Sequence, residues 1–235
     1  MPVYNAESHI TGVIKRIPND LWQDILDIWI INDGSTDRTG EVLDSLAAQY
    51  AKIRLIHHPC NKGYGAAVKT GLLKCKESAC SYAVCLHADG QYPPEFIREC
   101  LEFMRSNRHA IVQGSRIASG TALSGGMPRY KYVAGKILTF LENKVFGLSM
   151  TDYHSGFLCY SREALDNIQF RRLSSSFDFD LEVIASARAA GLRIGEVPIP
   201  TRYADEVSYL NPLTYGFRVI MVMFRYTLGM YRRAV

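Results

Sequence analysis

The chain has 235 residues, of which 48% are hydrophobic and 21% are charged, and its formal net charge is +4. This balance is ordinary for a globular protein with a substantial core, and it excludes a disordered chain. Basic residues cluster only near the C-terminal end, so composition gives no basis for binding nucleic acid. An α/β chain of this length is expected to form a single domain.

The six cysteines contain no C-x-x-C pair, and several lie within apolar runs. Free cysteine is among the most often buried residue types, so we expect these thiols to pack as small core side chains rather than to form disulfides or bind a metal. Such thiols fit a reducing cytosol. No charged segment followed by an apolar run opens the chain, so we expect no secretory signal and a cytoplasmic location.

The first five residues, Met1-Pro2-Val3-Tyr4-Asn5, are turn-forming and polar, where an α/β domain normally opens on an apolar strand. We therefore expect the first strand to be missing. Two explanations stay open: the domain begins one strand short, or Met1 lies downstream of the natural start.

Three times in the first half of the chain, a short apolar run leads into a polar loop and then into a segment with helical spacing. Strands are predicted at 25–32, 53–56 and 82–86, loops at 33–37, 61–65 and 87–91, and helices at about 42–50, 67–72 and 94–104. This alternation predicts a largely parallel sheet, which binds ligands outside the carboxyl ends of its strands. Asp33, Lys62 and Asp89 should therefore meet on one rim.

The second half changes in character after a fourth predicted strand at 110–113, which ends in Gly114-Ser115-Arg116. A glycine-rich loop follows, and then helices and a last strand are predicted. The expected elements are a long helix near 130–145, a polar loop at 152–156, a helix at about 180–190 and a strand at 194–197.

Three short motifs stand in order along the chain: 2–7 (PVYNAE), 31–37 (INDGSTD) and 88–91 (ADGQ). Together they resemble family-2 glycosyltransferases, and their wider order resembles dolichyl-phosphate mannose and glucose synthases. The resemblance implies a GT-A fold, a Rossmann-like, mostly parallel twisted sheet flanked by helices, in a single domain. The glycosyltransferase domain would span residues 1–210, followed by a C-terminal amphipathic basic helix at 211–235.

The resemblance also implies which residues hold a sugar-diphosphate donor. The first two motifs would line the nucleotide, and the N-x-G-x-G-like loop at 61–65 would approach its phosphates. The expected donor-binding residues are Pro2, Tyr4, Glu7, Asp33, Gly34, Ser35, Lys62, Gly63, Ala88, Asp89 and Arg116. Simpler interpretations stay open: strand-end and cap chemistry for 33–35, a solvated loop lysine for Lys62, and a structural ion pair for Arg116.

His87-Ala88-Asp89-Gly90-Gln91 occupies the place of the family's metal motif, in which the first position is commonly aspartate. The resemblance implies a divalent ion, Mn²⁺ or Mg²⁺, held by Asp89 with Gln91, which neutralises charge on the leaving diphosphate. His87 stands in place of the first aspartate. It would either bind manganese through its imidazole or lie beside a phosphate or the base without touching the metal.

Four residues are expected on the acceptor side. Asp180 opens a helix and is either a base for a hydroxyl acceptor or an acid that complements the helix dipole. Arg202 matches an arginine that contacts phosphate in the similar synthases, and its planar guanidinium suits that role. Ser155 and Ser208 are further candidates for acceptor or phosphate contacts. The catalytic set is thus Asp89, Asp180 and Arg202.

The C-terminal segment mixes apolar residues with Arg218, Arg225 and Arg232, which recur every seven residues. This spacing keeps the arginines close to one face of a helix, and the central arginine argues against a membrane span. Two interpretations stay open: a helix lying on an anionic bilayer, or a helix packed on the domain with solvated arginines.

The sequence as a whole predicts an inverting, membrane-associated glycosyltransferase of cell-envelope or glycan biosynthesis. It would move a sugar from a nucleoside diphosphate carrier of the GDP-mannose or UDP-glucose type to a polyprenyl phosphate, at the cytoplasmic face of a membrane. A non-lipid glycan acceptor is an alternative, and so is a nucleotide-sugar binding protein without turnover. We expect no nucleic-acid partner.

Overall fold

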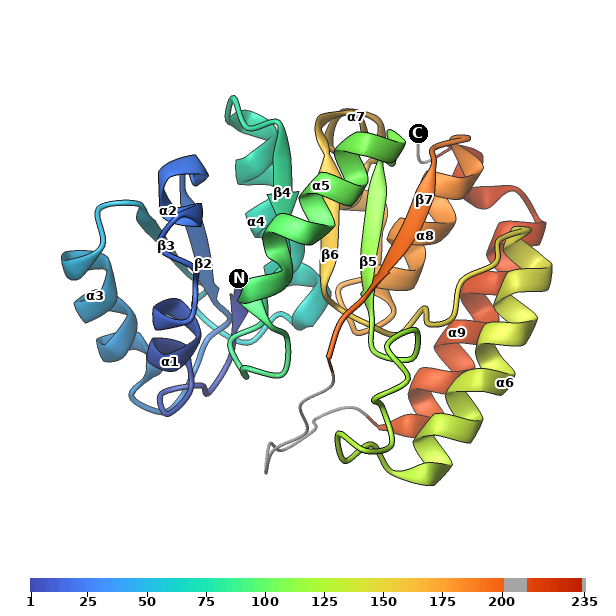
Figure 1. Cartoon of the computed structure of the whole chain (residues 1–235), viewed down its shortest axis with the longest axis horizontal. Coiled ribbons are helices and arrows are strands. Elements are labelled where there is room, and N and C mark those ends of the chain that lie inside the picture. Colours follow the sequence, from blue (N-terminus) through green and yellow to red (C-terminus); the bar gives the residue numbers. More distant parts are fainter. Residues whose placement is uncertain (201–210, 234–235) are drawn as a thin grey trace.

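The computed structural model describes residues 1–200 and 211–233, along which strands and helices alternate (Figure 1). The strands are β1 (Pro2–Val3), β2 (Ile28–Asn32), β3 (Ile53–His57), β4 (Tyr82–Val84), β5 (Ile111–Ser115), β6 (Leu158–Ser161) and β7 (Ile194–Pro198). The helices are α1 (Ile10–Lys15), α2 (Leu21–Asp24), α3 (Thr39–Gln49), α4 (Tyr64–Glu77), α5 (Ile97–Asn107), α6 (Arg129–Phe146), α7 (Arg162–Asn167), α8 (Phe179–Ala189) and α9 (Pro212–Thr227). The strand–loop–helix pattern predicted for the first half is confirmed.

The strands form two neighbouring sheets, with the orders β1-β2-β3 and β4-β6-β5-β7. All pairs in the first sheet are parallel, as are β5 and β7, whereas β6 runs antiparallel to β4 and β5. The sheet is therefore mostly parallel, as predicted. Strand β6 was not predicted, because a run of four residues with three apolar or aromatic ones does not distinguish a strand from a buried helical segment.

The chain opens on a two-residue strand, β1, and the expectation that a first strand is missing stays a prediction. Strand β1 pairs in parallel with β2, and the carbonyls of Met1 and Val3 accept hydrogen bonds from the amides of Ile31 and Asp33. Pro2 has no N–H to donate, but the N-terminal ammonium of Met1 donates to the Trp29 carbonyl at 2.7 Å, so proline does not interrupt the pairing. Turn-forming residue types therefore do not exclude a short strand.

Helix α8 lies deep in the second half of the molecule. Every residue from Phe179 to Ala187 is buried, including the carboxylates of Asp180 and Glu182, and Asp178 just before the helix is buried as well. Charged groups in such a position need partners, because their transfer out of water is costly. The buried carboxylates of helix α8 therefore need hydrogen-bond donors or cations from neighbouring elements.

Two arginines of helix α9 form ion pairs with these buried carboxylates. The Arg218 guanidinium lies 3.2 Å from Asp178 Oδ1, and the Arg225 guanidinium lies 3.3 Å from Glu182 Oε1. Of the two interpretations of the C-terminal helix, the structure supports a helix packed on the domain, against α6 and α8, although each of these arginines pairs with a buried carboxylate while its side chain stays 43% or 44% exposed. This pairing leaves the opposite side of α9 apolar. Contact with a bilayer stays a prediction.

Helices α6 and α9 lie side by side (Figure 1) and expose large apolar side chains. These side chains are 42–87% exposed and are Tyr130, Val133, Ile137, Phe140, Leu141, Leu213, Phe217, Ile220, Phe224, Leu228 and Met230; we call them the outer helix face. Apart from Arg225, which pairs with Glu182, the exposed cations on the same segments are Arg129, Lys136, Lys144 and Arg232. The only acid within 129–146 and 211–233 is the buried Glu142. In the described residues, no helix is both long and apolar enough to cross a membrane.

Candidate active site

The loops that follow β1 and β2 are joined by hydrogen bonds between side chains and backbone. The Asn5 amide donates to Ser35 Oγ (3.0 Å), and Asn5 Oδ1 accepts from the Thr36 amide (2.8 Å). Glu7 Oε2 accepts from the Arg38 amide at 2.8 Å. The first two sequence motifs therefore form one structural unit at the carboxyl ends of their strands, as the topology predicts.

Asp33 is a buried carboxylate that shapes the next loop. Its Oδ1 accepts a hydrogen bond from the Lys62 amide (3.0 Å) and lies 2.7 Å from His58 Nδ1, and its Oδ2 accepts from the Gly63 amide (2.9 Å). His58 is buried too, and its Nε2 lies 3.1 Å from Thr70 Oγ1 in α4. Asp33 thereby fixes the loop that begins α4, and its contact with a nucleotide base stays a prediction.

His58 was missed by the sequence reasoning, although it directly follows β3 at the ligand-binding edge. Two glycines let its loop approach its neighbours. At Gly34 (φ +70°) a Cβ would collide with the backbone of Cys60, and at Gly63 (φ +96°) it would collide with the carbonyl of Ser175. Both positions need glycine for their positive φ and for space beside these protein neighbours, and the approach of this loop to a phosphate stays a prediction. The Lys62 side chain is exposed.

Tyr64, Asp180 and His87 are linked in a row. The Tyr64 hydroxyl donates to Asp180 Oδ2 at 2.8 Å and lies 3.0 Å from His87 Nε2. Burial raises the pKa of Asp180 to about 7, and the hydrogen bond from Tyr64 acts in the opposite direction. Burial also lowers the pKa of His87, against the influence of Asp89. Tyr64 was not predicted as a site residue; its signal was its place beside Gly63 in the glycine loop.

The loop after β4 carries the residues predicted to hold a divalent ion. Asp89 and Gln91 are partly exposed, and Asp89 Oδ1 accepts a hydrogen bond from the Gln91 amide at 3.0 Å. Within residues 1–200 and 211–233, no three His, Cys, Asp or Glu side chains form a metal-binding group. Magnesium-type ions commonly use one or two carboxylates together with substrate phosphates and water. Asp89 supplies one carboxylate of the kind that such an ion uses.

The loop before β6 closes over His87. The Gly156 amide donates to the Tyr92 hydroxyl at 2.9 Å, and a Cβ on Gly156 would collide with the His87 imidazole. Arg116 Nη2 donates to the carbonyl of His154 at 3.1 Å, and the guanidinium carbon lies 5.5 Å from the Tyr92 ring centre. Ser155 is fully buried. Arg116 and Ser155 are thus both placed beside the His87 loop.

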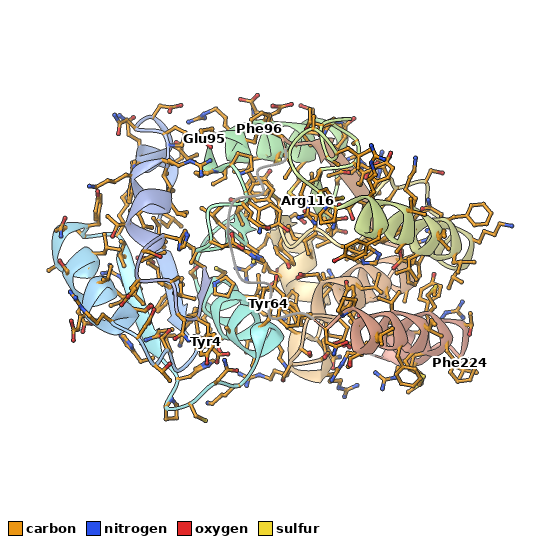
Figure 2. The ribbon with its side chains drawn as sticks, turned by 90° about the horizontal axis from the view of Figure 1, so that it is seen from below. Tyr4, Tyr64, Glu95, Phe96, Arg116 and Phe224 are labelled. Carbon is orange, nitrogen blue, oxygen red and sulfur yellow. The ribbon has the colours of Figure 1, made fainter. Side chains whose placement is uncertain are left out.

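The predicted site residues fall into two neighbouring groups. One comprises the loops of Pro2 to Glu7, Asp33 to Ser35 and Lys62 to Gly63, and the other comprises His87 to Gln91, Arg116, Ser155 and Asp180. Tyr64 connects them, and Figure 2 shows it where α4 begins, near the centre of the molecule. Ala88 is buried rather than open to a ligand. Arg202 and Ser208 lie outside the described residues, so their roles stay predictions.

The raised pKa of Asp180 predicts a pH-dependent stability. An unfolded aspartate has a pKa near 4, so a folded value of about 7 stabilises the fold at low pH, and this contribution is lost as the pH rises through 7. Between pH 5 and pH 8, Asp180→Asn should gain about 3 kcal/mol of unfolding free energy relative to the wild type. Urea denaturation at both pH values measures this. The matched control is Asp166→Asn on the surface, and equal pH dependence of both variants would contradict the prediction.

The sheet order and the arrangement of polar loops on its carboxyl edge define a GT-A-type α/β enzyme fold. The family model described as "Glycosyl transferase family 2" matches residues 1–169. The chain belongs to this family of glycosyltransferases.

Two curated relatives and one group of solved structures are similar over most of the chain. The UDP-N-acetylglucosamine–dolichyl-phosphate N-acetylglucosaminyltransferase of Methanococcus voltae is 28% identical, covering 97% of this chain and 95% of the relative. The dolichol-phosphate mannosyltransferase of Saccharomyces cerevisiae is 28% identical, covering 84% and 74%. Glucosyl-3-phosphoglycerate synthase of Mycobacterium tuberculosis superposes with a TM-score of 0.69 at 18% identity, covering 96% and 77%. A further structure of that synthase contains Mn²⁺ and UDP-glucose.

Proposed function

We propose that the protein transfers a sugar, with inversion, from a nucleoside diphosphate sugar to a polyprenyl phosphate. The observation that carries this proposal is the hydrogen-bonded row from the metal-motif loop to Asp180, because it joins the expected donor side to the expected acceptor side of one site. The similarity to a dolichyl-phosphate N-acetylglucosaminyltransferase over nearly the whole chain supports a lipid phosphate as acceptor.

The donor is placed in the loops around Asp33. The unit formed by Asn5 and Ser35 would receive the nucleoside, and the glycine loop fixed by Asp33 would approach the diphosphate. The UDP-glucose bound by the solved synthase makes a uridine nucleotide one candidate, and the mannosyltransferase similarity keeps a GDP-mannose-type donor as the other. Arg116 is proposed to contact the donor from the opposite side.

A divalent ion, Mn²⁺ or Mg²⁺, is proposed to bind through Asp89, with Gln91 beside it. Such an ion supplies charge neutralisation for the departing nucleoside diphosphate. The Mn²⁺ in the solved synthase supports this choice. Asp89 contributes a carboxylate that is partly exposed, and its loop is held by its own hydrogen bond to the Gln91 amide.

In the transfer, an oxygen of the acceptor phosphate attacks the anomeric carbon while the bond from that carbon to the donor diphosphate breaks. The attacking oxygen is already anionic, so no proton has to be removed. Asp180 therefore serves the acceptor by orientation rather than as a strong base. A pKa of about 7 allows its carboxyl to stay protonated beside an anion, and its Oδ1 has no hydrogen-bond partner within the described residues. Arg202 and Ser208 are proposed to add phosphate contacts.

We also place the protein at a membrane surface, with the outer helix face toward the lipid. Arg218 and Arg225 pair with buried carboxylates of α8, which leaves that face apolar, and the exposed cations Arg129, Lys136, Lys144 and Arg232 complement an anionic bilayer. A second copy of the chain fits less well, because like charges would meet without acids between them. The six free thiols support the cytoplasmic side.

The donor assignment is tested by thermal unfolding with a panel of nucleoside diphosphates and their sugars, with and without Mn²⁺. A ligand that binds only the folded protein raises the melting temperature. We expect one nucleotide to do so, and more strongly with Mn²⁺. No shift with any nucleotide would contradict the donor site, whereas a shift without any sugar transfer would support a binding protein without turnover.

A further inference from the structure

Arg16 directly follows helix α1 and holds the loop after β4 at two points. Its Nη1 donates to the carbonyl of Gly90 at 3.0 Å. Its Nε and Nη2 donate to the two carboxylate oxygens of Glu95, at 2.9 Å and 3.0 Å. The planar, forked guanidinium group makes all three bonds at once. One side chain therefore closes the segment 90–95.

The Gly90 carbonyl belongs to the peptide unit that also supplies a donor to Asp89. The N–H of this unit is that of Gln91, and it donates to Asp89 Oδ1 at 3.0 Å. A peptide unit is planar, so its carbonyl and its N–H turn together. Hydrogen bonds linked in this way also polarise and strengthen one another. A change at Arg16 therefore reaches the Asp89 carboxylate through one rigid unit.

The place of Arg16 is set by the packing of helix α1, whose apolar residues are buried. Val13 of this helix touches the loop directly, because a Cβ on Gly90, where φ is +80°, would lie 3.7 Å from Val13 Cγ2. The helix begins shortly after the segment 2–7, which is expected to line the nucleotide. Helix α1 therefore connects the expected nucleoside side of the site with the loop that carries Asp89.

The charge of Arg16 is balanced by Glu95. A guanidinium without a counter-charge would repel a divalent ion bound nearby. The two side chains are 25% and 43% exposed, and Figure 2 shows Glu95 toward the outside of the molecule and Tyr64 near its centre. An ion pair that is open to solvent adds little to the stability of a fold, so we expect variants of Arg16 to remain folded.

We propose that Arg16 is a positioning residue for the divalent ion: it orients the peptide unit between Gly90 and Gln91 and, through it, the Asp89 carboxylate. This inference rests on the proposed function. It assigns a role in the site to a residue that lies outside the three sequence motifs.

The test compares Arg16→Gln with Arg98→Gln. Arg98 also joins two elements at the surface, through ion pairs with Asp20 and Asp24 at 3.1 Å, and both partners lie outside the loop after β4. Mn²⁺ is titrated in the presence of UDP or GDP, and thermal unfolding reports binding. We expect Arg16→Gln to raise the half-saturating Mn²⁺ concentration by about 10-fold, as for other residues that support a metal ligand, and Arg98→Gln to change it by less than about 2-fold.

Two further readouts separate positioning from a merely structural role. Without metal, Arg16→Gln should bind the nucleotide as tightly as the wild type. In sugar transfer, its kcat at saturating Mn²⁺ should stay within about 3-fold of the wild type, because the lost interaction concerns binding of the ion. Glu95→Gln keeps the bond to the Gly90 carbonyl but leaves the guanidinium unbalanced, so it should raise the half-saturating Mn²⁺ concentration by only about 2- to 5-fold.

Equal Mn²⁺ requirements of Arg16→Gln and Arg98→Gln, or weaker nucleotide binding by Arg16→Gln without metal, would overturn the proposal. If Arg16→Gln does not fold, an unchanged requirement in Glu95→Gln decides against it. The failure of the proposed function is distinguishable, because it would appear as absent sugar transfer by a wild-type protein whose nucleotide binding still depends on Mn²⁺. Wild-type nucleotide binding that is independent of Mn²⁺ would overturn the role of Arg16 together with the ion site.

Discussion

Replacing Asp89 with alanine should lower the rate of sugar transfer by about 10³-fold, because removing a group that stabilises developing charge commonly costs two to three powers of ten. The same variant should lose the Mn²⁺-dependent part of the rise in melting temperature produced by the nucleoside diphosphate. Asp89 is partly exposed, and the substitution removes a local hydrogen bond from the Gln91 amide, so the protein should remain folded. Initial rates and thermal unfolding with and without Mn²⁺ measure both effects.

The matched control for Asp89 is Asp166→Ala, because Asp166 is an aspartate on α7 that pairs at the surface with Arg162. This control should transfer sugar at the wild-type rate and keep the metal-dependent shift. If Asp89→Ala retained the metal-dependent shift, the ion would be held elsewhere, and the assignment of the loop after β4 as the metal anchor would be wrong.

Replacing both Phe217 and Phe224 with aspartate should weaken binding to anionic phospholipid vesicles by about 100-fold. The two side chains are 64% and 55% exposed on the outer helix face, and each aromatic side chain taken out of water contributes about 1.5–3 kcal/mol. Figure 2 shows Phe224 on the outer side of the molecule. Cosedimentation with vesicles containing phosphatidylglycerol measures the affinity.

The control for the vesicle experiment is Leu26→Asp, because Leu26 is 57% exposed but lies before β2, in the other half of the molecule. This variant should bind vesicles like the wild type. Equal binding by the double variant would contradict a lipid-facing role for α6 and α9. A change from dimer to monomer in the double variant, without any change in vesicle binding, would instead identify a second copy as the partner of this face.

Much of the first half of the fold was predictable, because apolar runs followed by polar loops mark parallel strands with helical crossovers. The contact between the Lys62 amide and Asp33 at the carboxyl ends of β2 and β3 followed from that topology, and the meeting of Asp89 with them stays a prediction. Strand β6 did not, because its pairing with β4 and β5 depends on contacts far apart in sequence. The two-residue β1 did not either, because its residues are turn-forming types and its pairing with β2 depends on residues about 30 positions away.

The candidate site was predicted in its motifs but not in its connections. His58 and Tyr64 act through partners on other elements, Asp33 for the first and Asp180 with His87 for the second. No local pattern specifies such pairs. The ion pairs of the arginines in α9 were likewise not predictable, because a seven-residue spacing places these residues on one face of the helix but does not show which element packs against that face. The buried carboxylates of α8 are the partners of Arg218 and Arg225.

The most direct test of the proposed function is to incubate the protein with a nucleoside diphosphate sugar, Mn²⁺ and a polyprenyl phosphate in vesicles, and to analyse the lipid by mass spectrometry. We expect one donor to give a polyprenyl phosphate whose mass is increased by one sugar residue, with release of the nucleoside diphosphate. Nucleotide binding without a glycosylated lipid from any donor would contradict the proposed transfer to a polyprenyl phosphate.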